Sequence, residues 1–246
     1  MYQIKRAIIM AAGKGERLRP VTDQIPKPLI KVNGVPMIET IIQALIQNGI
    51  REIYVVIGYL KEQFGYLCQQ YGVNLIDNPY YDSCNNIASL YVARNHLEDA
   101  MILDGDQIIS KADILDPFFE KSGYHAVWTE QETAEWLMQV SDGTVTSCSR
   151  EGGKIGWQLF SVSRWCSEDG KKLKKHLEIE FEQNKNRQIY WDDVPMFCHF
   201  EDYDLGIFPM QFGDIIEIDQ LQELIALDSS YAEGRNDERN TDEKKN

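Results

Sequence analysis

Apolar runs alternate with helix-patterned segments between residues 7 and 106, and this alternation restricts the fold more than any other feature of the chain. Four short aliphatic runs are typical of buried strands, at residues 7–13, 52–58, 73–77 and 100–106. Between them, apolar residues recur at helical spacing in residues 35–49, 61–72 and 86–98. This order predicts an α/β fold with a Rossmann-like, mostly parallel sheet flanked by helices.

The pattern changes after Gln107, where the segments become short, aromatic and β-branched, with turn residues between them. They predict an antiparallel, β-rich insertion that adds strands to the sheet. The segments concerned are residues 124–130, 135–141, 144–149 and 156–163.

Two further elements are expected beyond that insertion, a charged helix around residues 167–185 and a strand turning into a helix at 214–227. We predict one domain over residues 1–227, with halves of about 1–110 and 111–227. Residues 228–246 lack apolar periodicity, which predicts a disordered polar tail or linker.

Positive charge is concentrated at the start of an acidic chain. The net charge is −14, yet residues 1–31 hold seven basic side chains against two acidic ones. The overall charge argues against nucleic acid as a partner, whereas a local basic region suits a small anion such as a nucleoside triphosphate.

Cysteine usage and hydropathy bear on the compartment. The five cysteines are odd in number, widely spaced and form no CxxC pair, which argues against a disulfide framework or a zinc site and favours a reducing cytoplasm. No apolar run approaches the length of a bilayer span, and the first residues do not resemble a signal peptide. We therefore expect a cytoplasmic protein without a membrane partner, either a monomer or a homodimer.

The basic region contains a glycine-rich loop directly after the first predicted strand. Closely spaced glycines at 13 and 15 let backbone N–H groups approach an anion, and a following helix would add a favourable dipole. Arg17 and Lys27 have the reach and charge to contact phosphate oxygens. The spacing fits neither GxxxxGK[ST] nor GxGxxG, since Leu18 stands where the last glycine would be.

The complete run reads Ala11-Ala12-Gly13-x-Gly15-x-Arg17-Leu18-x-Pro20-x-Thr22-x-x-x-Pro26-Lys27. It resembles the signature of the nucleotidyltransferases that join a nucleoside triphosphate to a phosphorylated sugar or alcohol. The resemblance implies that the loop, Lys14 included, wraps the triphosphate, with Ala11 to Gly13 near the base and ribose. It also implies that Arg17 and Lys27 contact the phosphates.

Carboxylates follow two predicted strands, where open α/β sheets bind ligands. Asp104 and Asp106 stand in "LDGDQ", and Glu217 and Asp219 in "IEIDQL". Mg²⁺ prefers such oxygen ligands, although Asp106 in a turn and Asp219 as a helix cap are the simpler interpretations of isolated residues. The family resemblance implies that Asp106 and Asp219 hold Mg²⁺ and that Asp104 lies near the nucleotide.

Aromatic and acidic residues in the second half suggest a site for a cationic head group. A quaternary ammonium is held by aromatic faces and carboxylates, and the chain supplies Trp136 and the run Tyr190-Trp191-Asp192. Each aromatic residue alone is more often part of a core.

Several segments occur in the same order as in the bacterial CTP:phosphocholine cytidylyltransferases, which the chain resembles over nearly residues 5–227: "GYLKEQFGYL", "NNIASLY", "EWLMQV", "YWDD" and "EID". This resemblance implies that the β-rich insertion forms the acceptor site. Asn86 and Ser89 are expected to approach cytosine. The residues expected around choline are Trp136, Tyr190, Trp191, Asp192 and Glu217.

The expected reaction joins CTP and phosphocholine to give CDP-choline and pyrophosphate. A sugar-1-phosphate nucleotidyltransferase remains an alternative, as do a catalytically silent nucleotide-binding module and one portion of a larger polypeptide. The unrelated cytidylyltransferases that use an HxGH motif are excluded, because none of the four histidines is paired in that way.

Overall fold

The computed structural model describes residues 1–232. Its largest sheet has a parallel centre in which β2 pairs with both β5 and β7, and β5 pairs with β6. These strands coincide with the four predicted runs, so the α/β prediction is confirmed. Their bounds are Arg6–Ala11 for β2, Glu52–Ile57 for β5, Asn74–Asp77 for β6 and Ala100–Asp104 for β7.

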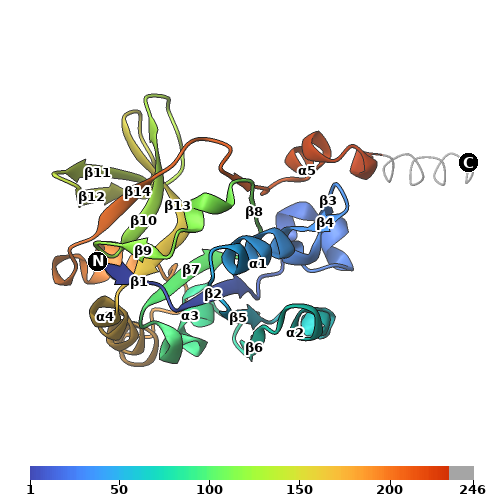
Figure 1. Cartoon of the computed structure of the whole chain (residues 1–246), viewed down its shortest axis with the longest axis horizontal. Helices are drawn as coiled ribbons and strands as arrows, with labels where there is room; N and C mark the ends of the chain where they lie inside the picture. Colours follow the sequence, from blue (N-terminus) through green and yellow to red (C-terminus); the bar gives the residue numbers. More distant parts are fainter. Residues whose placement is uncertain (233–246) are drawn as a thin grey trace, which may run out of the picture.

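Helices cover both faces of this parallel centre (Figure 1). Successive strand residues point to opposite faces, so Ala7 and Ile9 of β2 pack with α1 and α2, whereas Ile8 and Met10 pack with α3 and α4. The parallel strands are therefore buried on both sides, as their continuous apolar sequences indicate. The helices are α1 (Met37–Gln47), α2 (Gly65–Tyr71), α3 (Ile87–Val92) and α4 (Ser167–Glu178).

The β-rich half continues the same sheet. β13 pairs antiparallel with β7 and with β10 and β11, β12 extends the edge beyond β11, and β14 lies parallel to β10. This arrangement confirms the predicted antiparallel addition to a mostly parallel sheet. The strands are β10 (Gly123–Thr129), β11 (Leu137–Ser141), β12 (Thr144–Ser149), β13 (Gly156–Trp165) and β14 (Gly206–Pro209).

Short two-stranded ribbons join distant parts of the chain. β15 pairs with β8, which follows β7 in the chain, and β1 pairs with β9. A third ribbon, β3–β4, leads into α1, and the helix α5 follows β15. The bounds are Tyr2–Gln3 (β1), Lys31–Val32 (β3), Val35–Pro36 (β4), Gln107–Ile109 (β8), Phe118–Phe119 (β9), Ile215–Glu217 (β15) and Leu221–Leu227 (α5).

Some elements differ from expectation. No α-helix follows the glycine loop directly, because three 3₁₀ turns precede α1, at Glu16–Leu18, Val21–Asp23 and Lys27–Leu29. The prolines in this stretch lack the N–H that a continuous helix needs. A 3₁₀ turn, Lys61–Phe64, precedes α2. Both α3 and α4 are shorter than predicted: a 3₁₀ turn, Arg94–His96, follows α3, and a π-helical turn, Ile179–Gln183, follows α4.

The first residues of the predicted polar tail contact the rest of the domain. Asp228 accepts a hydrogen bond from the backbone N–H of Asn33 at 2.8 Å, and the Tyr231 hydroxyl donates to the Lys31 carbonyl at 2.8 Å. Residues 228–232 are therefore ordered against the β3–β4 ribbon, and the predicted disorder is wrong for them. The remainder of that predicted tail, 233–246, lies outside the described residues. Within the part that is described, no helix is long and apolar enough to cross a membrane.

Candidate active site

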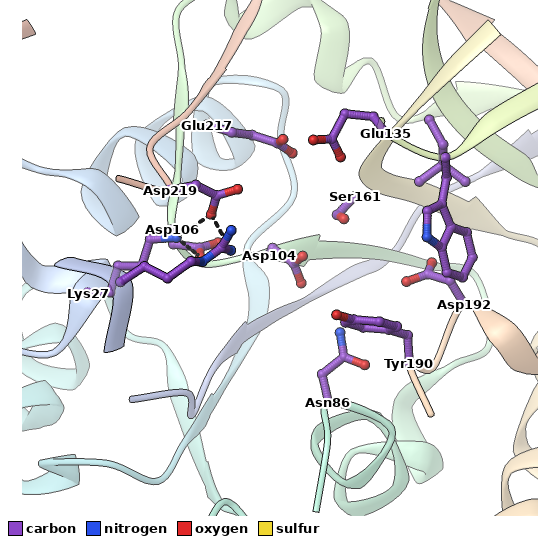
Figure 2. A pocket seen from close by; sticks show the side chains of 13 residues that line it. Lys27, Asn86, Asp104, Asp106, Glu135, Ser161, Tyr190, Asp192, Glu217 and Asp219 are labelled. Carbon is purple, nitrogen blue, oxygen red and sulfur yellow. Dashed lines mark hydrogen bonds and ion pairs between the residues drawn. The ribbon is translucent and has the colours of Figure 1, made fainter. Parts of the chain in front are cut away.

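Lys27 lies at the centre of charged side chains drawn from both ends of the chain. Its Nζ is 2.6 Å from Oδ2 of Asp106 and 3.0 Å from Oδ1 of Asp219, between which it points in Figure 2. Nη2 of Arg17 is 2.8 Å from the same Asp219 oxygen. Burial disfavours the charged form of Lys27, but the two carboxylates outweigh burial and raise its pKa, so it is a cation at neutral pH. The four residues expected to be catalytic are thus brought together.

The glycine loop lets Lys27 approach. Gly15 has φ +62°, a conformation that L side chains rarely adopt, and a Cβ placed on it would lie 2.8 Å from the Cβ of Lys27. The Thr22 hydroxyl donates to the Gly15 carbonyl at 3.0 Å and holds the loop in this position. Gly15 therefore packs against the lysine stem.

A small apolar core carries Asp219 to this loop. Leu18 and Ile30, on either side of the lysine in sequence, pack with Ile218 and with Leu221 of α5. The neighbouring ribbon places Glu217 opposite Gln107, immediately after Asp106. Both carboxylates that meet Lys27 are therefore fixed by strands that pair with each other.

The cleft around Lys27 has two sides that share the charged cluster. The loop side is lined by backbone and small residues that include Ala11, Gly13 and Gly15. The other side opens toward the β-rich half. Six residues line both sides: Arg17, Lys27, Asn86, Asp106, Tyr190 and Asp219. The two sides of the cleft therefore meet at the charged cluster that holds Arg17 and Lys27.

The side toward the β-rich half, where the acceptor is expected and which is called the acceptor side below, has four carboxylates beyond Asp106 and Asp219, together with two aromatic rings: Asp104, Glu135, Asp192, Glu217, Trp136 and Tyr190. Figure 2 shows the four carboxylates directed into this hollow. The rings of Trp136 and Tyr190 stand edge to face, with their centroids 6.0 Å apart.

Burial and mutual repulsion shift the pKa values of these carboxylates upward. Burial, with the charge of Asp106, raises the pKa of Glu217 to about 7. Burial raises the pKa of Asp192 to about 7, opposed by the Tyr124 hydroxyl. Burial together with Asp106 and Asp192 raises the pKa of Asp104 well above its usual range. A cation bound here would stabilise the charged forms of all three carboxylates.

The structure corrects two expected site residues. Trp191 is only 1% exposed and stacks on Tyr124, with ring centroids 5.9 Å apart, so it belongs to the core and not to the acceptor site. Ser89 is buried, and its hydroxyl accepts a hydrogen bond from Asn78 at 3.1 Å, so it does not reach a nucleotide in the cleft.

Three other residues of the expected site have side chains that are paired within the protein or buried. The side chain of Lys14 pairs with Asp82 and does not line the cleft, and that of Ala12 is buried. Asn86 does line the cleft, but its Oδ1 already accepts the backbone N–H of Trp191 at 2.8 Å.

Sequence reasoning missed Glu135 and Ser161. Glu135 precedes Trp136 in a connection between two strands, and Ser161 lies within β13, next to the acceptor hollow. The signal for Glu135 was its place beside a predicted aromatic ligand, whereas an isolated serine in a strand carries no such signal.

The family model of the MobA-like NTP transferase domain matches residues 7–172. Among curated proteins, the 2-aminoethylphosphonate cytidylyltransferase of Lancefieldella rimae is 39% identical over 228 residues, which are 92% of each chain. The choline-phosphate cytidylyltransferase of Streptococcus pneumoniae is 33% identical and covers 91% of this chain and 96% of that protein. The chain belongs to the MobA-like NTP transferase family.

Within the MobA-like NTP transferases, these long matches identify the chain as a nucleotidyltransferase of the cytidylyltransferase group. The solved CTP:phosphocholine cytidylyltransferase of Streptococcus pneumoniae superposes with a TM-score of 0.84 at 33% identity, covering 92% of this chain and 98% of that one. The inositol-1-phosphate CTP transferase of T. maritima, at 16% identity and a TM-score of 0.74, shares the fold.

Proposed function

We propose that this cytidylyltransferase transfers the cytidylyl group of CTP to a small acceptor whose phosphonate or phosphate lies two carbons from an ammonium group. The first candidate acceptor is 2-aminoethylphosphonate, and the second is phosphocholine. The relatives that act on these two compounds, by their names, match more than 90% of the chain at 39% and 33% identity.

The observation that carries the choice is the balance of carboxylates and aromatic rings in the acceptor hollow. A primary ammonium donates three N–H groups and suits a wall of carboxylates, of which four line the hollow besides Asp106 and Asp219. A quaternary ammonium donates none and is held mainly by aromatic faces. Only Trp136 and Tyr190 offer such faces there, since Trp191 belongs to the core. This balance favours the primary amine.

Phosphocholine stays the second candidate because Trp136 and Tyr190 meet at right angles. Their planes are 88° apart, so they form two walls of a corner into which a trimethylammonium group would fit. Asp192 and Glu217 would supply the negative charge that such a group also attracts.

The charged cluster fits an Mg²⁺ ion. Asp106 and Asp219 both approach Lys27 Nζ within 3.0 Å, which means that their carboxylates already converge on one positive charge. Both are oxygen donors of the type that Mg²⁺ prefers, and both lie between the two sides of the cleft. We propose that they hold Mg²⁺, which would neutralise phosphate charge when bound.

The chain's own residues then perform binding and orientation. Arg17 and Lys27 would contact the triphosphate, and the bare backbone at Gly13 and Gly15 would admit its oxygens. The acceptor hollow would hold the ammonium and leave the phosphonate facing the cluster. A phosphonate oxygen forms the new bond to the α-phosphorus of CTP as the bond to pyrophosphate breaks. Lys27 and Arg17 would stabilise the negative charge that gathers on the leaving pyrophosphate.

Pyrophosphate release across a panel of substrates tests this proposal. CTP, UTP and dTTP would each be combined with 2-aminoethylphosphonate, phosphocholine, phosphoethanolamine and glucose 1-phosphate, with and without Mg²⁺. We expect the highest kcat/KM for CTP with 2-aminoethylphosphonate and no release without Mg²⁺. Preference for glucose 1-phosphate with UTP or dTTP would replace the proposal by a sugar-1-phosphate nucleotidyltransferase, and no release with any pair would favour a silent nucleotide-binding module.

A further inference from the structure

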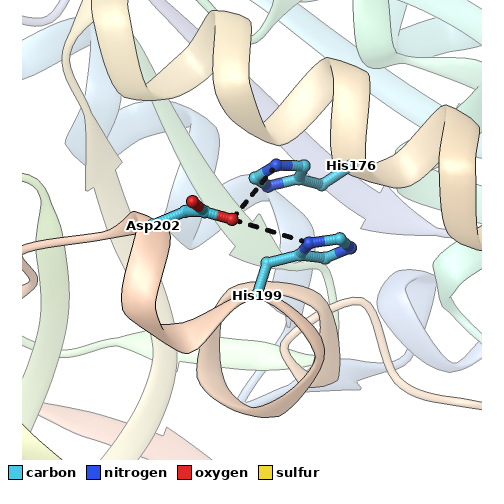
Figure 3. A group of neighbouring side chains, drawn as sticks. All are labelled: His176, His199 and Asp202. Carbon is cyan, nitrogen blue, oxygen red and sulfur yellow. Dashed lines mark ion pairs between the residues drawn. The ribbon is translucent and has the colours of Figure 1, made fainter.

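A second cluster of potential ligands lies at the end of α4, on the side of the molecule formed by residues 176–203. His176 of α4 faces His199 and Asp202, which belong to the irregular segment after Val194 (Figure 3). One potential ligand atom from each of the three residues lies within 4.8 Å of those from the other two. None of these three residues lines the cleft described above.

The spacing of these atoms suits a shared ion better than direct hydrogen bonds. Asp202 Oδ2 is 3.6 Å from His176 Nε2 and 3.7 Å from His199 Nδ1, and both distances are too long for a hydrogen bond. Two ligand atoms of a tetrahedral zinc ion, at about 2.0–2.2 Å from the metal, lie roughly 3.4 Å apart. The distances from Asp202 Oδ2 to the two ring nitrogens are therefore close to those between ligand atoms that share one ion.

The other nitrogen of each ring has a partner, as metal-binding histidines usually require. His176 Nδ1 is 2.8 Å from the Tyr203 hydroxyl, and His199 Nε2 is 2.9 Å from Oε1 of Glu180. Glu180 is itself buried and receives hydrogen bonds from Asn184 and Asn186. With His176 Nδ1 donating to the Tyr203 hydroxyl and His199 Nε2 donating to Glu180, the nitrogens that face Asp202, His176 Nε2 and His199 Nδ1, would carry the lone pairs that a metal ion needs.

We infer that His176, His199 and Asp202 form a binding site for one divalent transition-metal ion, with Zn²⁺ the best match to two imidazoles and one carboxylate. Asp202 is the exposed member and gives the ion a path from solvent. The two rings are parallel within 4°, with centroids 3.8 Å apart, so they must tilt toward the ion by rotation about their Cβ–Cγ bonds.

Such an ion would connect α4 to the segment that carries the acceptor wall. Tyr190 and Asp192 line the cleft, and the chain then runs through the turn Val194–Cys198 to His199. Coordination would fix the far end of this segment to α4 and leave the catalytic cluster untouched. The effect expected is therefore on stability.

Zinc binding to the full-length, EDTA-treated protein tests the site. Competition with a chromophoric chelator would measure affinity, and ring ¹⁵N shifts would identify the coordinating nitrogens. We expect one Zn²⁺ ion, shifts at His176 Nε2 and His199 Nδ1, and affinity reduced at least about 10-fold in D202N and in H199Q, because loss of an outer partner of a ligand alone costs about 10- to 100-fold. Zn²⁺ should raise the midpoint temperature of thermal unfolding of the unsubstituted protein and should not raise that of D202N.

Three controls keep the test specific. H96Q alters a histidine that stacks on Tyr54, outside the cluster, and should bind Zn²⁺ normally. D219N and C198S test the catalytic carboxylate and the neighbouring thiol as other zinc ligands, and both should retain the ion. Absence of Zn²⁺ binding by the unsubstituted protein, or full binding in both D202N and H199Q, would overturn the inference. Because Asp202 is exposed, D202N keeps the test valid if H199Q does not fold.

Discussion

Lys27 and Asp219 are 192 residues apart in the chain and meet at 3.0 Å. The pair joins two distant segments at the candidate active site, since the lysine comes from the glycine-rich loop and the aspartate from the segment that follows β15. The candidate site therefore depends on packing between the beginning of the domain and its segment 215–219.

Replacing either carboxylate of the cluster should remove turnover. In D106N and D219N, Lys27 loses one of its two partners and the proposed Mg²⁺ ligand set is incomplete, so we expect kcat to fall by about a thousandfold or more. Stopped assays of pyrophosphate release would measure this, and chemical unfolding should remain cooperative. D204N, which breaks a surface pair with Lys121, is the control and should keep its activity. Near-normal kcat in both variants would remove these aspartates from the chemistry.

Gly15→Ala should affect both stability and catalysis. An alanine at this position would have to adopt φ +62°, which is strained for an L residue, and its Cβ would lie 2.8 Å from the Cβ of Lys27. We expect a loss of about 1–2 kcal/mol in the free energy of unfolding and a fall in kcat/KM for CTP.

The matched control is Gly72→Ala, because Gly72 also has positive φ, +71°, but has no atom within 4 Å of the added Cβ. It should show the backbone cost in urea unfolding and leave kcat/KM unchanged. Equal effects of the two substitutions on kcat/KM would contradict a special packing role for Gly15.

The fold was predictable from sequence because its elements rest on local patterns. The parallel strands follow the aliphatic runs, and the charged cluster follows the motif in which Arg17 and Lys27 stand. The prolines at 20, 26 and 28 also predict that no continuous helix follows the glycines, because proline interrupts helical hydrogen bonding.

Individual site residues were less predictable because burial depends on tertiary packing. Tyr190 and Trp191 are neighbours in sequence, yet one is half exposed at the cleft and the other is in the core. In a segment without regular secondary structure, the periodicity of the sequence does not predict which side chains are buried. Glu135 belongs to the β10–β11 connection and lines the hollow, a position that only the tertiary fold determines.

Acceptor binding should strengthen as the pH rises through about 7. The pKa of Glu217 is raised to about 7 from 4.5, and that of Asp192 to about 7 from 3.8, mainly by burial. The folded protein holds these protons more tightly than the unfolded chain. Each group therefore lowers the stability of the free protein progressively between its unfolded pKa and about pH 7. A cationic acceptor relieves this penalty.

The KM for the acceptor, measured between pH 5.5 and 8.5 at saturating CTP (a range chosen to bracket about 7), should fall with rising pH in the unsubstituted protein. In E217Q the fall should be smaller, and what remains should follow the ionisation of Asp192 and of the acceptor itself. Identical profiles for the two proteins would show that Glu217 does not contact the acceptor.

Substitution of the acceptor wall should separate the two candidate head groups. E135Q removes a carboxylate that a primary ammonium would contact, so we expect the KM for 2-aminoethylphosphonate to rise about tenfold with less effect on phosphocholine. W136A removes an aromatic face and should reduce turnover of phosphocholine more. Steady-state kinetics with both acceptors would check this crossover, and parallel changes for both acceptors would argue against distinct contacts.

The most direct test of the account is the identity of the product, followed by ³¹P NMR with CTP, Mg²⁺ and 2-aminoethylphosphonate. We expect pyrophosphate and a coupled pair of resonances, one phosphonate and one phosphate, from a new P–O–P linkage to CMP. Unchanged CTP and 2-aminoethylphosphonate, beside ready conversion of a sugar 1-phosphate, would contradict it.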